Sequence, residues 1–135
     1  MWSNKAFRLF LSSLVFFVLC QVSNVLLEEP AICNTGIGLG IEIPVIWRVI
    51  LIVLTFTIAC LLFRNILQNT ERLTLAILFG GSFLFGGALS NIADRVLRGC
   101  VPDFFALSFF PAFNMADIGI SVGVFILLFS VLKKS

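Results

Sequence analysis

The 135-residue sequence contains no histidine and no tyrosine, and only 12% of its residues are charged. The absence of histidine excludes Ser-His-Asp and Cys-His hydrolases, histidine-ligated zinc sites and the two-histidine metalloprotease helix. An ordinary globular domain carries about 25% charged residues, whereas this chain is 60% hydrophobic, with a mean hydropathy of +1.14. These proportions exclude a soluble globular protein and a disordered one. The net charge of +2 is too small and too scattered to indicate nucleic-acid binding.

Long apolar runs take the place of the missing charges. A helix needs about 20 mostly apolar residues to cross the hydrocarbon core of a membrane. Four stretches meet this requirement, at about residues 9–27, 45–63, 73–91 and 115–132. We therefore predict an all-α membrane protein with four transmembrane helices, a single domain over residues 1–135 and a small subdomain in its outer loops. The first span has no small-x-small cleavage site, so we interpret it as retained and not as a removed signal peptide.

The basic residues predict the orientation of the spans, because cytoplasmic loops carry an excess of Lys and Arg. Six basic residues fall on one side of the predicted membrane, namely Lys5, Arg8, Arg64, Arg72, Lys133 and Lys134. Three fall on the other side, namely Arg48, Arg95 and Arg98. This distribution predicts that both termini are cytoplasmic and that the connections 28–44 and 92–114 face outward.

Two of the seven acidic residues lie at the predicted outer ends of spans. Asp94 lies where the third span reaches the outer interface, and Asp117 lies just inside the outer end of the fourth. An ionisable group costs about 2.5–3.5 kcal/mol at the centre of a membrane helix and less near the interface, so such groups tend to be paired and functional. One loop between antiparallel helices separates the two aspartates, so we expect them at the same depth. We interpret the acids Glu28, Glu29, Glu42 and Glu71 as solvated.

Polar neighbours share the expected helix faces of both aspartates. Ser90 and Asn91 precede Asp94 by four and three residues, and Asn114 precedes Asp117 by three. Two close carboxyl groups share a proton, so that one can act as a general base on water and the other as a general acid toward a peptide bond. This is the chemistry of an aspartic protease, which needs neither histidine nor metal.

A purely structural role is the alternative for these two aspartates. Each can cap a helix, or pair with Arg95 or Arg98, because carboxylates are common near helix N-termini. The spacing alone does not distinguish a catalytic pair from these structural roles.

The four cysteines form no Cys-x-x-Cys motif, so a metal or redox site is not indicated. Cys33 and Cys100 both fall in predicted outer segments and could form a disulfide. We favour the interpretation that all four cysteines are free.

Several motifs resemble those of the lipoprotein signal peptidase (signal peptidase II) family. The string Gly86-Gly87-Ala88-Leu89-Ser90-Asn91-Ile92-Ala93-Asp94-Arg95 resembles the main signature of that family. Val101-Pro102-Asp103-Phe104 is similar to the short motif that follows, and Phe113-Asn114-Met115-Ala116-Asp117 to the second signature. Asn34-Thr35-Gly36, followed by Ile37-Gly38-Leu39-Gly40, resembles the motif of the first outer loop. The order of these motifs agrees with the family over essentially the whole chain.

The resemblance implies an intramembrane aspartic endopeptidase of the bacterial inner membrane, with its active site toward the outer face. Such enzymes bind lipidated prolipoproteins within the lipid bilayer and cut just before the diacylglyceryl-modified cysteine, with no metal or cofactor. By resemblance, Asp94 and Asp117 form the catalytic pair, Asn91 and Asn114 hydrogen-bond near them, and Asn34 and Arg95 position the substrate or the outer loop. Asp103 follows a proline in a polar loop, and we interpret it as support for that loop. We expect a monomer.

The first span departs from the family pattern. Where the family has an Asp-Gln-x-Thr-Lys-like motif, this chain has Cys20-Gln21-Val22-Ser23-Asn24, so that a neutral pair replaces a charged one. This change leaves open a non-catalytic paralogue that binds lipidated substrate. A small proton-coupled transporter is a further alternative, but it would favour a carboxylate near mid-membrane, whereas both candidate aspartates lie near one interface.

Overall fold

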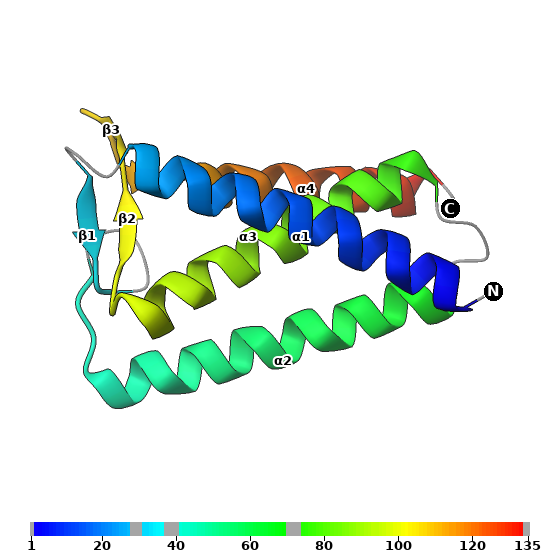
Figure 1. The fold of residues 1–135 in the computed structure, drawn as a ribbon, viewed down its shortest axis with the longest axis horizontal. Coiled ribbons are helices and arrows are strands. Elements are labelled where there is room, and N and C mark those ends of the chain that lie inside the picture. The colour runs from blue at the N-terminus through cyan, green and yellow to red at the C-terminus, as the bar shows by residue number, and fades with distance from the viewer. Residues whose placement is uncertain (1, 28–30, 37–40, 70–73, 134–135) are drawn as a thin grey trace.

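The computed structural model describes residues 2–27, 31–36, 41–69 and 74–133, and these form a bundle of four helices with short strands at one end (Figure 1). The helices are α1 (Trp2–Leu26), α2 (Val45–Asn69), α3 (Leu75–Leu97) and α4 (Met115–Leu132). Some predicted features lie outside the described residues, namely residues 37–40 of the first-loop motif, Glu28, Glu29, Glu71, Arg72 and Lys134.

Successive helices run in opposite directions, so both termini lie at one end of the bundle (Figure 1). We call this the terminal end, and we call the opposite end, where the strands lie, the strand end. Among the described residues, three helices are long and apolar enough to cross a membrane, and α4 contains a shorter apolar stretch, Met115–Ser130. Large apolar side chains cover much of the outer surface of the bundle, as expected where helices face hydrocarbon.

Helix α3 is the centre of the bundle and packs between α1 and α4. Small residues on α3 permit this, because they let neighbouring backbones approach closely in lipid. A Cβ atom added to Gly86 would lie 2.5 Å from the carbonyl oxygen of Ser13 on α1. One added to Gly87 would lie 2.7 Å from the carbonyl oxygen of Ala116 on α4. The glycines therefore set how close α1 and α4 come to α3.

Helix α2 meets the other helices mainly near the terminal end. There Leu67 is buried with Leu9 and Phe85, and the Phe63 ring lies 5.1 Å from the Phe85 ring. Toward the strand end α2 separates from α1 (Figure 1). Helix α2 is therefore anchored to the bundle mainly at the terminal end.

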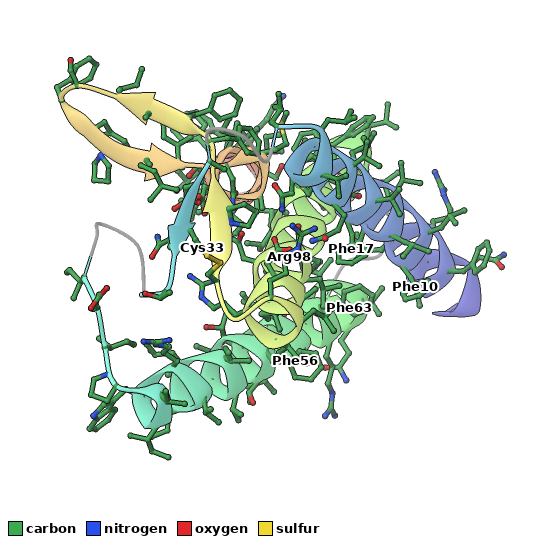
Figure 2. The ribbon with its side chains drawn as sticks, turned by 60° about the vertical axis from the view of Figure 1, so that its left-hand side comes forward. Phe10, Phe17, Cys33, Phe56, Phe63 and Arg98 are labelled. Carbon is green, nitrogen blue, oxygen red and sulfur yellow. A yellow bond between two sulfur atoms is a disulfide. The ribbon has the colours of Figure 1, made fainter. Side chains whose placement is uncertain are left out.

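The described parts of the connections at the strand end contain four short strands, which the all-α prediction omitted. Strand β1 (Ile32–Asn34) pairs antiparallel with β2 (Val101–Asp103), and β3 (Phe105–Leu107) pairs antiparallel with β4 (Phe110–Phe113). The β3–β4 hairpin extends away from the helices (Figure 2). The molecule is therefore mostly helical, with two small β-ladders at the strand end. Apolar periodicity did not reveal β1 and β2, because their partners are far apart in sequence.

The interpretation of all four cysteines as free was wrong for two of them. Cys33 and Cys100 form a disulfide with their Cα atoms 5.5 Å apart, whereas Cys20 and Cys60 are free. Helix α3 ends at Leu97, and Gly99 follows with a φ of +77°, a conformation that glycine adopts readily. This turn directs the chain from α3 into β2 and brings Cys100 beside β1, where Figure 2 labels Cys33.

Candidate active site

Asp117 is fixed by the first turn of α4. The side-chain Oδ1 of Asn114 accepts a hydrogen bond from the Asp117 backbone N–H (3.0 Å), and Asp117 Oδ2 accepts one from the Asn114 backbone N–H (3.1 Å). This reciprocal pair is a capping box, which satisfies two backbone donors that a helix start otherwise leaves free. The sequence Asn-x-x-Asp therefore both starts α4 and orients the carboxylate.

Asn91 on α3 connects this helix start to the centre of the bundle. Its Nδ2 donates to Asp117 Oδ1 (3.0 Å), and its Oδ1 accepts from Asn114 Nδ2 (3.1 Å). Asn91 and Asn114 are buried. The predicted proximity of Asn91 and Asn114 to Asp117 is therefore observed in the structure.

Asp103, at the end of β2, is a second carboxyl group in this region. It is 3% exposed, its Oδ2 accepts a hydrogen bond from Asn34 Nδ2 (2.9 Å), and its buried Oδ1 has no hydrogen-bond partner in the described part of the chain. Burial raises the pKa of Asp103 to about 6. The bond from Asn34 and the charge of Arg95 oppose that rise, and the negative charge of Asp117 adds to it.

A turn after β1 orients Asn34 toward Asp103. Asn34 Oδ1 accepts a hydrogen bond from the Gly36 backbone N–H (3.0 Å), which leaves the amide nitrogen to donate to Asp103. The Gly36 carbonyl in turn accepts from Arg95 Nη2 (3.3 Å). A Cβ on Gly36 would collide with the backbone of Ile41. The first-loop motif thus ties β1 to both Asp103 and Arg95.

One cavity of about 440 Å³ brings these side chains together. Its polar lining consists of Asn34, Asn91, Arg95, Asp103, Asp117 and Ser121. Phe110, Phe113, Ile118 and Val122 supply apolar walls. Two carboxyl groups from different elements, β2 and α4, therefore face one space with a guanidinium at its edge.

Asp94 lies elsewhere. Its side chain is 1% exposed and turned toward α1, where Oδ2 accepts from Asn24 Nδ2 (2.7 Å) and Oδ1 from Gln21 Nε2 (3.2 Å). Arg98 Nε lies 3.4 Å from Oδ1. Within the described residues no hydrogen bond joins Asp94 to Asp117, and Asp94 is not among the residues that line the cavity. The expected meeting of Asp94 and Asp117 is thus not among the observed contacts.

The sequence predicted Asp94 at the site because its span is antiparallel and adjacent to the span that carries Asp117. The sequence analysis interpreted Asp103 as support for its loop. It also missed the contact of Gln21 and Asn24 with Asp94. The sequence signal for the contact between Asn34 and Asp103 is the pair Cys33 and Cys100, because linking these cysteines brings Asn34 beside Asp103.

A second cavity of about 370 Å³ lies between α2 and α3, toward the strand end. Its lining is mostly apolar, and Asn91 and Arg95 line both this cavity and the one that contains the two acids. An apolar cleft therefore adjoins the acidic cavity.

Comparison with known proteins assigns the chain to a family. The family model described as Signal peptidase (SPase) II matches residues 5–133. The chain belongs to the signal peptidase II family. Signal peptidase II sequences form the family of aspartic peptidases termed Peptidase_A8.

Individual relatives in the signal peptidase II family agree with this assignment. The lipoprotein signal peptidase of Aquifex aeolicus is 38% identical over 109 residues, which cover 76% of this chain and 64% of the relative. That of Polynucleobacter necessarius is 34% identical over 105 residues, covering 75% of this chain and 53% of the relative. The chain therefore spans between about half and two thirds of the length of these relatives.

Two solved structures of bacterial membrane enzymes share the fold of this chain. A bacterial membrane enzyme determined by the in meso method at 2.3 Å resolution matches with a TM-score of 0.77 and 25% identity, over 93% of this chain and 87% of that one. A second, at 1.9 Å resolution, matches with a TM-score of 0.75 over 94% of both chains. The chain is thus a bacterial membrane protein with several apolar helices.

Proposed function

We propose that this chain is an intramembrane aspartic endopeptidase that removes the signal peptide from diacylglyceryl-modified prolipoproteins by cutting before the lipidated cysteine. The observation that carries the proposal is the cavity into which Asp103 and Asp117 both face. Membership of the signal peptidase II family supports the substrate class.

Within this proposal, Asp103 and Asp117 are the catalytic pair. The earlier prediction of Asp94 with Asp117 stays a prediction, but the observed contacts favour Asp103. Asp94 already accepts hydrogen bonds from two side-chain amides of α1 and lies beside Arg98, whereas Asp103 Oδ1 is buried without a hydrogen-bond partner among the described residues. An unpartnered buried oxygen is costly unless a ligand or water completes it.

The surroundings of the two carboxyl groups assign them different roles. Asp117 accepts hydrogen bonds from Asn91 Nδ2 and the Asn114 backbone, which hold its carboxyl group in a fixed position for the role of general base. Asp103 has a raised pKa, which suits a general acid. Asp117 then takes a proton from a water molecule as the oxygen of that water attacks the scissile carbonyl carbon. Asp103 gives its proton to the amide nitrogen as the carbon–nitrogen bond breaks.

The apolar cleft between α2 and α3 suits the apolar parts of the substrate. It begins at Asn91 and Arg95, beside the acids, and continues along Ile52, Ala59 and Leu84. An acyl chain or an apolar signal segment in this cleft would keep its contact with hydrocarbon while the scissile bond reaches the acidic cavity. Asn34 and Arg95 then position the substrate at the junction, and one copy of the chain suffices.

We place the strand end at the outer face of the bacterial inner membrane and both termini in the cytoplasm. The Lys and Arg distribution supports this orientation. The disulfide at the strand end supports it independently, because disulfides persist in oxidising compartments and are rare in the cytosol.

The test is cleavage of a synthetic diacylglyceryl prolipopeptide by the purified full chain in lipid. The wild type should cleave it, and Asp103→Asn and Asp117→Asn should each lower kcat by about 10²–10⁴-fold, the usual contribution of a general acid or base. Asp94→Asn is the matched control. It should retain a measurable kcat but unfold at a lower temperature, because it alters a buried contact between α1 and α3.

Three outcomes would contradict parts of this proposal. If Asp94→Asn abolishes cleavage while Asp103→Asn retains it, with both variants folded, Asp94 and not Asp103 is the catalytic partner of Asp117. A wild type that binds the lipidated peptide without cleaving it would indicate a non-catalytic paralogue. Proton-coupled flux in liposomes without cleavage would indicate a transporter.

A further inference from the structure

The covalent link between β1 and the start of β2 has no role in the chemistry proposed above. Cys33 immediately precedes Asn34, and Cys100 lies three residues before Asp103. The disulfide therefore joins the segment that carries the hydrogen-bond donor to the segment that carries the acid.

We propose that the Cys33–Cys100 disulfide is a positioning element of the active site, which holds Asn34 against Asp103, and that its reduction lowers peptidase activity. This inference rests on the proposed function, because it needs Asp103 to take part in cleavage.

In the described part of the chain, β1 has few other attachments. The β1–β2 ladder is three residues long on each strand, and isolated two-stranded ladders are at best marginally stable. Two side-chain contacts reinforce it, namely Asn34 with Asp103 and Arg95 with the Gly36 carbonyl. The cysteines are 67 residues apart in sequence, so bringing the strands together without the cross-link costs considerable chain entropy.

Reduction is a balanced exchange. A dithiol such as dithiothreitol attacks one sulfur of the disulfide, and its second thiol then closes the reagent into a cyclic disulfide. The protein gains two electrons and two protons and becomes a pair of thiols at Cys33 and Cys100. The reagent loses the same number of each.

A pH profile separates positioning from a general effect on stability. Three groups face Asp103, namely Asn34 from β1, Arg95 from α3 and Asp117 from α4. The hydrogen bond from Asn34 lowers the pKa of Asp103, so losing that bond raises it further. If Asp103 is the general acid, activity falls as the pH rises through its pKa. Reduction should therefore move this alkaline limb to higher pH.

The experiment measures kcat/KM against pH for the full-length chain in lipid, oxidised and after reduction with dithiothreitol, well below its unfolding temperature. Reduction should lower the maximum kcat/KM by about tenfold, the upper end of the net contribution of one hydrogen bond, and shift the alkaline limb upward. The double variant Cys33→Ser/Cys100→Ser should have the same kcat/KM profile as the reduced wild type, and dithiothreitol should not change that profile. Cys60→Ser, which removes an exposed free cysteine on α2, should behave as the wild type in both states.

Asn34→Ala tests whether the disulfide acts through Asn34. In this background reduction should no longer shift the alkaline limb, because the donor is already absent. A shift that persists in Asn34→Ala, or a reduced wild type with an unchanged profile, would overturn the inference while leaving the proposed function intact. An oxidised wild type that does not cleave the lipopeptide would overturn the proposed function and this inference with it.

Discussion

At the scale of single residues, most of the site depends on asparagine amides. Asn34, Asn91 and Asn114 donate to Asp103 or Asp117 or connect them to the helices, and Asn24 donates to Asp94. Asn24 stands where the family resemblance led us to expect a lysine. A neutral amide can hold a carboxyl group in either protonation state, whereas an ammonium group favours the ionised form. The replacement of lysine by Asn24 therefore preserves the contact between α1 and Asp94 of α3 without a charge on α1.

Asp103 makes the stability of the protein depend on pH. Its pKa is raised from 3.8 to about 6 in the folded state, so the folded state binds the proton more tightly than the unfolded state. The resulting stabilisation is complete below pH 3.8 and is lost as the pH rises to about 6. A shift of about two pKa units corresponds to roughly 3 kcal/mol.

Thermal unfolding of the purified chain in detergent, followed between pH 3.5 and 7.5, checks this prediction. The unfolding temperature of the wild type should fall across that window relative to Asp103→Asn, which cannot titrate there. Parallel curves for the two proteins would show that Asp103 has an ordinary pKa.

At the scale of elements, the helices were predictable and the strands were not. A run of apolar residues must form a helix in hydrocarbon, where its backbone polar groups have no other partners. Strands β1 and β2 pair residues such as Asn34 and Val101, which lie far apart in the chain. Nothing local in either segment identifies its partner. The burial of Asp103 was not predictable for the same reason, because it depends on a strand from the other loop.

The close contact of α3 with α4 should control the position of Asp117. In Gly87→Ala the new methyl group would lie 2.7 Å from the Ala116 carbonyl oxygen and 3.0 Å from a side-chain carbon of Ile120. Helix α4 must then move away, at a cost of about 1–3 kcal/mol, and Asp117 moves with it. We expect a lower unfolding temperature and a lower kcat.

Ala76→Val, at an exposed position near the start of α3, is the matched control for Gly87→Ala and should change neither quantity. Wild-type kcat in Gly87→Ala would show that α4 tolerates the displacement.

At the scale of the whole molecule, the architecture separates a tightly packed part from an open one. Helices α1, α3 and α4 pack closely and fix the position of Asp117, while α2 borders the apolar cleft. The sequence could predict four apolar segments, but not which of them is peripheral, because all four are similarly apolar. The glycines and polar residues of α3 were the only indication that it is central.

Filling the cleft should affect substrate binding more than chemistry. In Ala59→Phe a bulky ring on α2 would occupy space between α2 and Leu84 or Ala88 of α3. We expect KM for the diacylglyceryl peptide to rise roughly tenfold with little change in kcat. Val53→Phe, on the exposed side of α2, should leave KM unchanged. Equal KM values for the two variants would place the apolar part of the substrate outside this cleft.

The disulfide also constrains when the protein becomes complete during biosynthesis. Its cysteines flank two apolar helices, so in the proposed orientation the bond can close only after α2 and α3 have been inserted and both flanking segments have been exported. A nascent or partly inserted chain holds Asn34 and Asp103 on segments that have not yet met. In the proposed orientation, hydrolytic competence is therefore a late event in assembly, confined to chains that have reached their final topology.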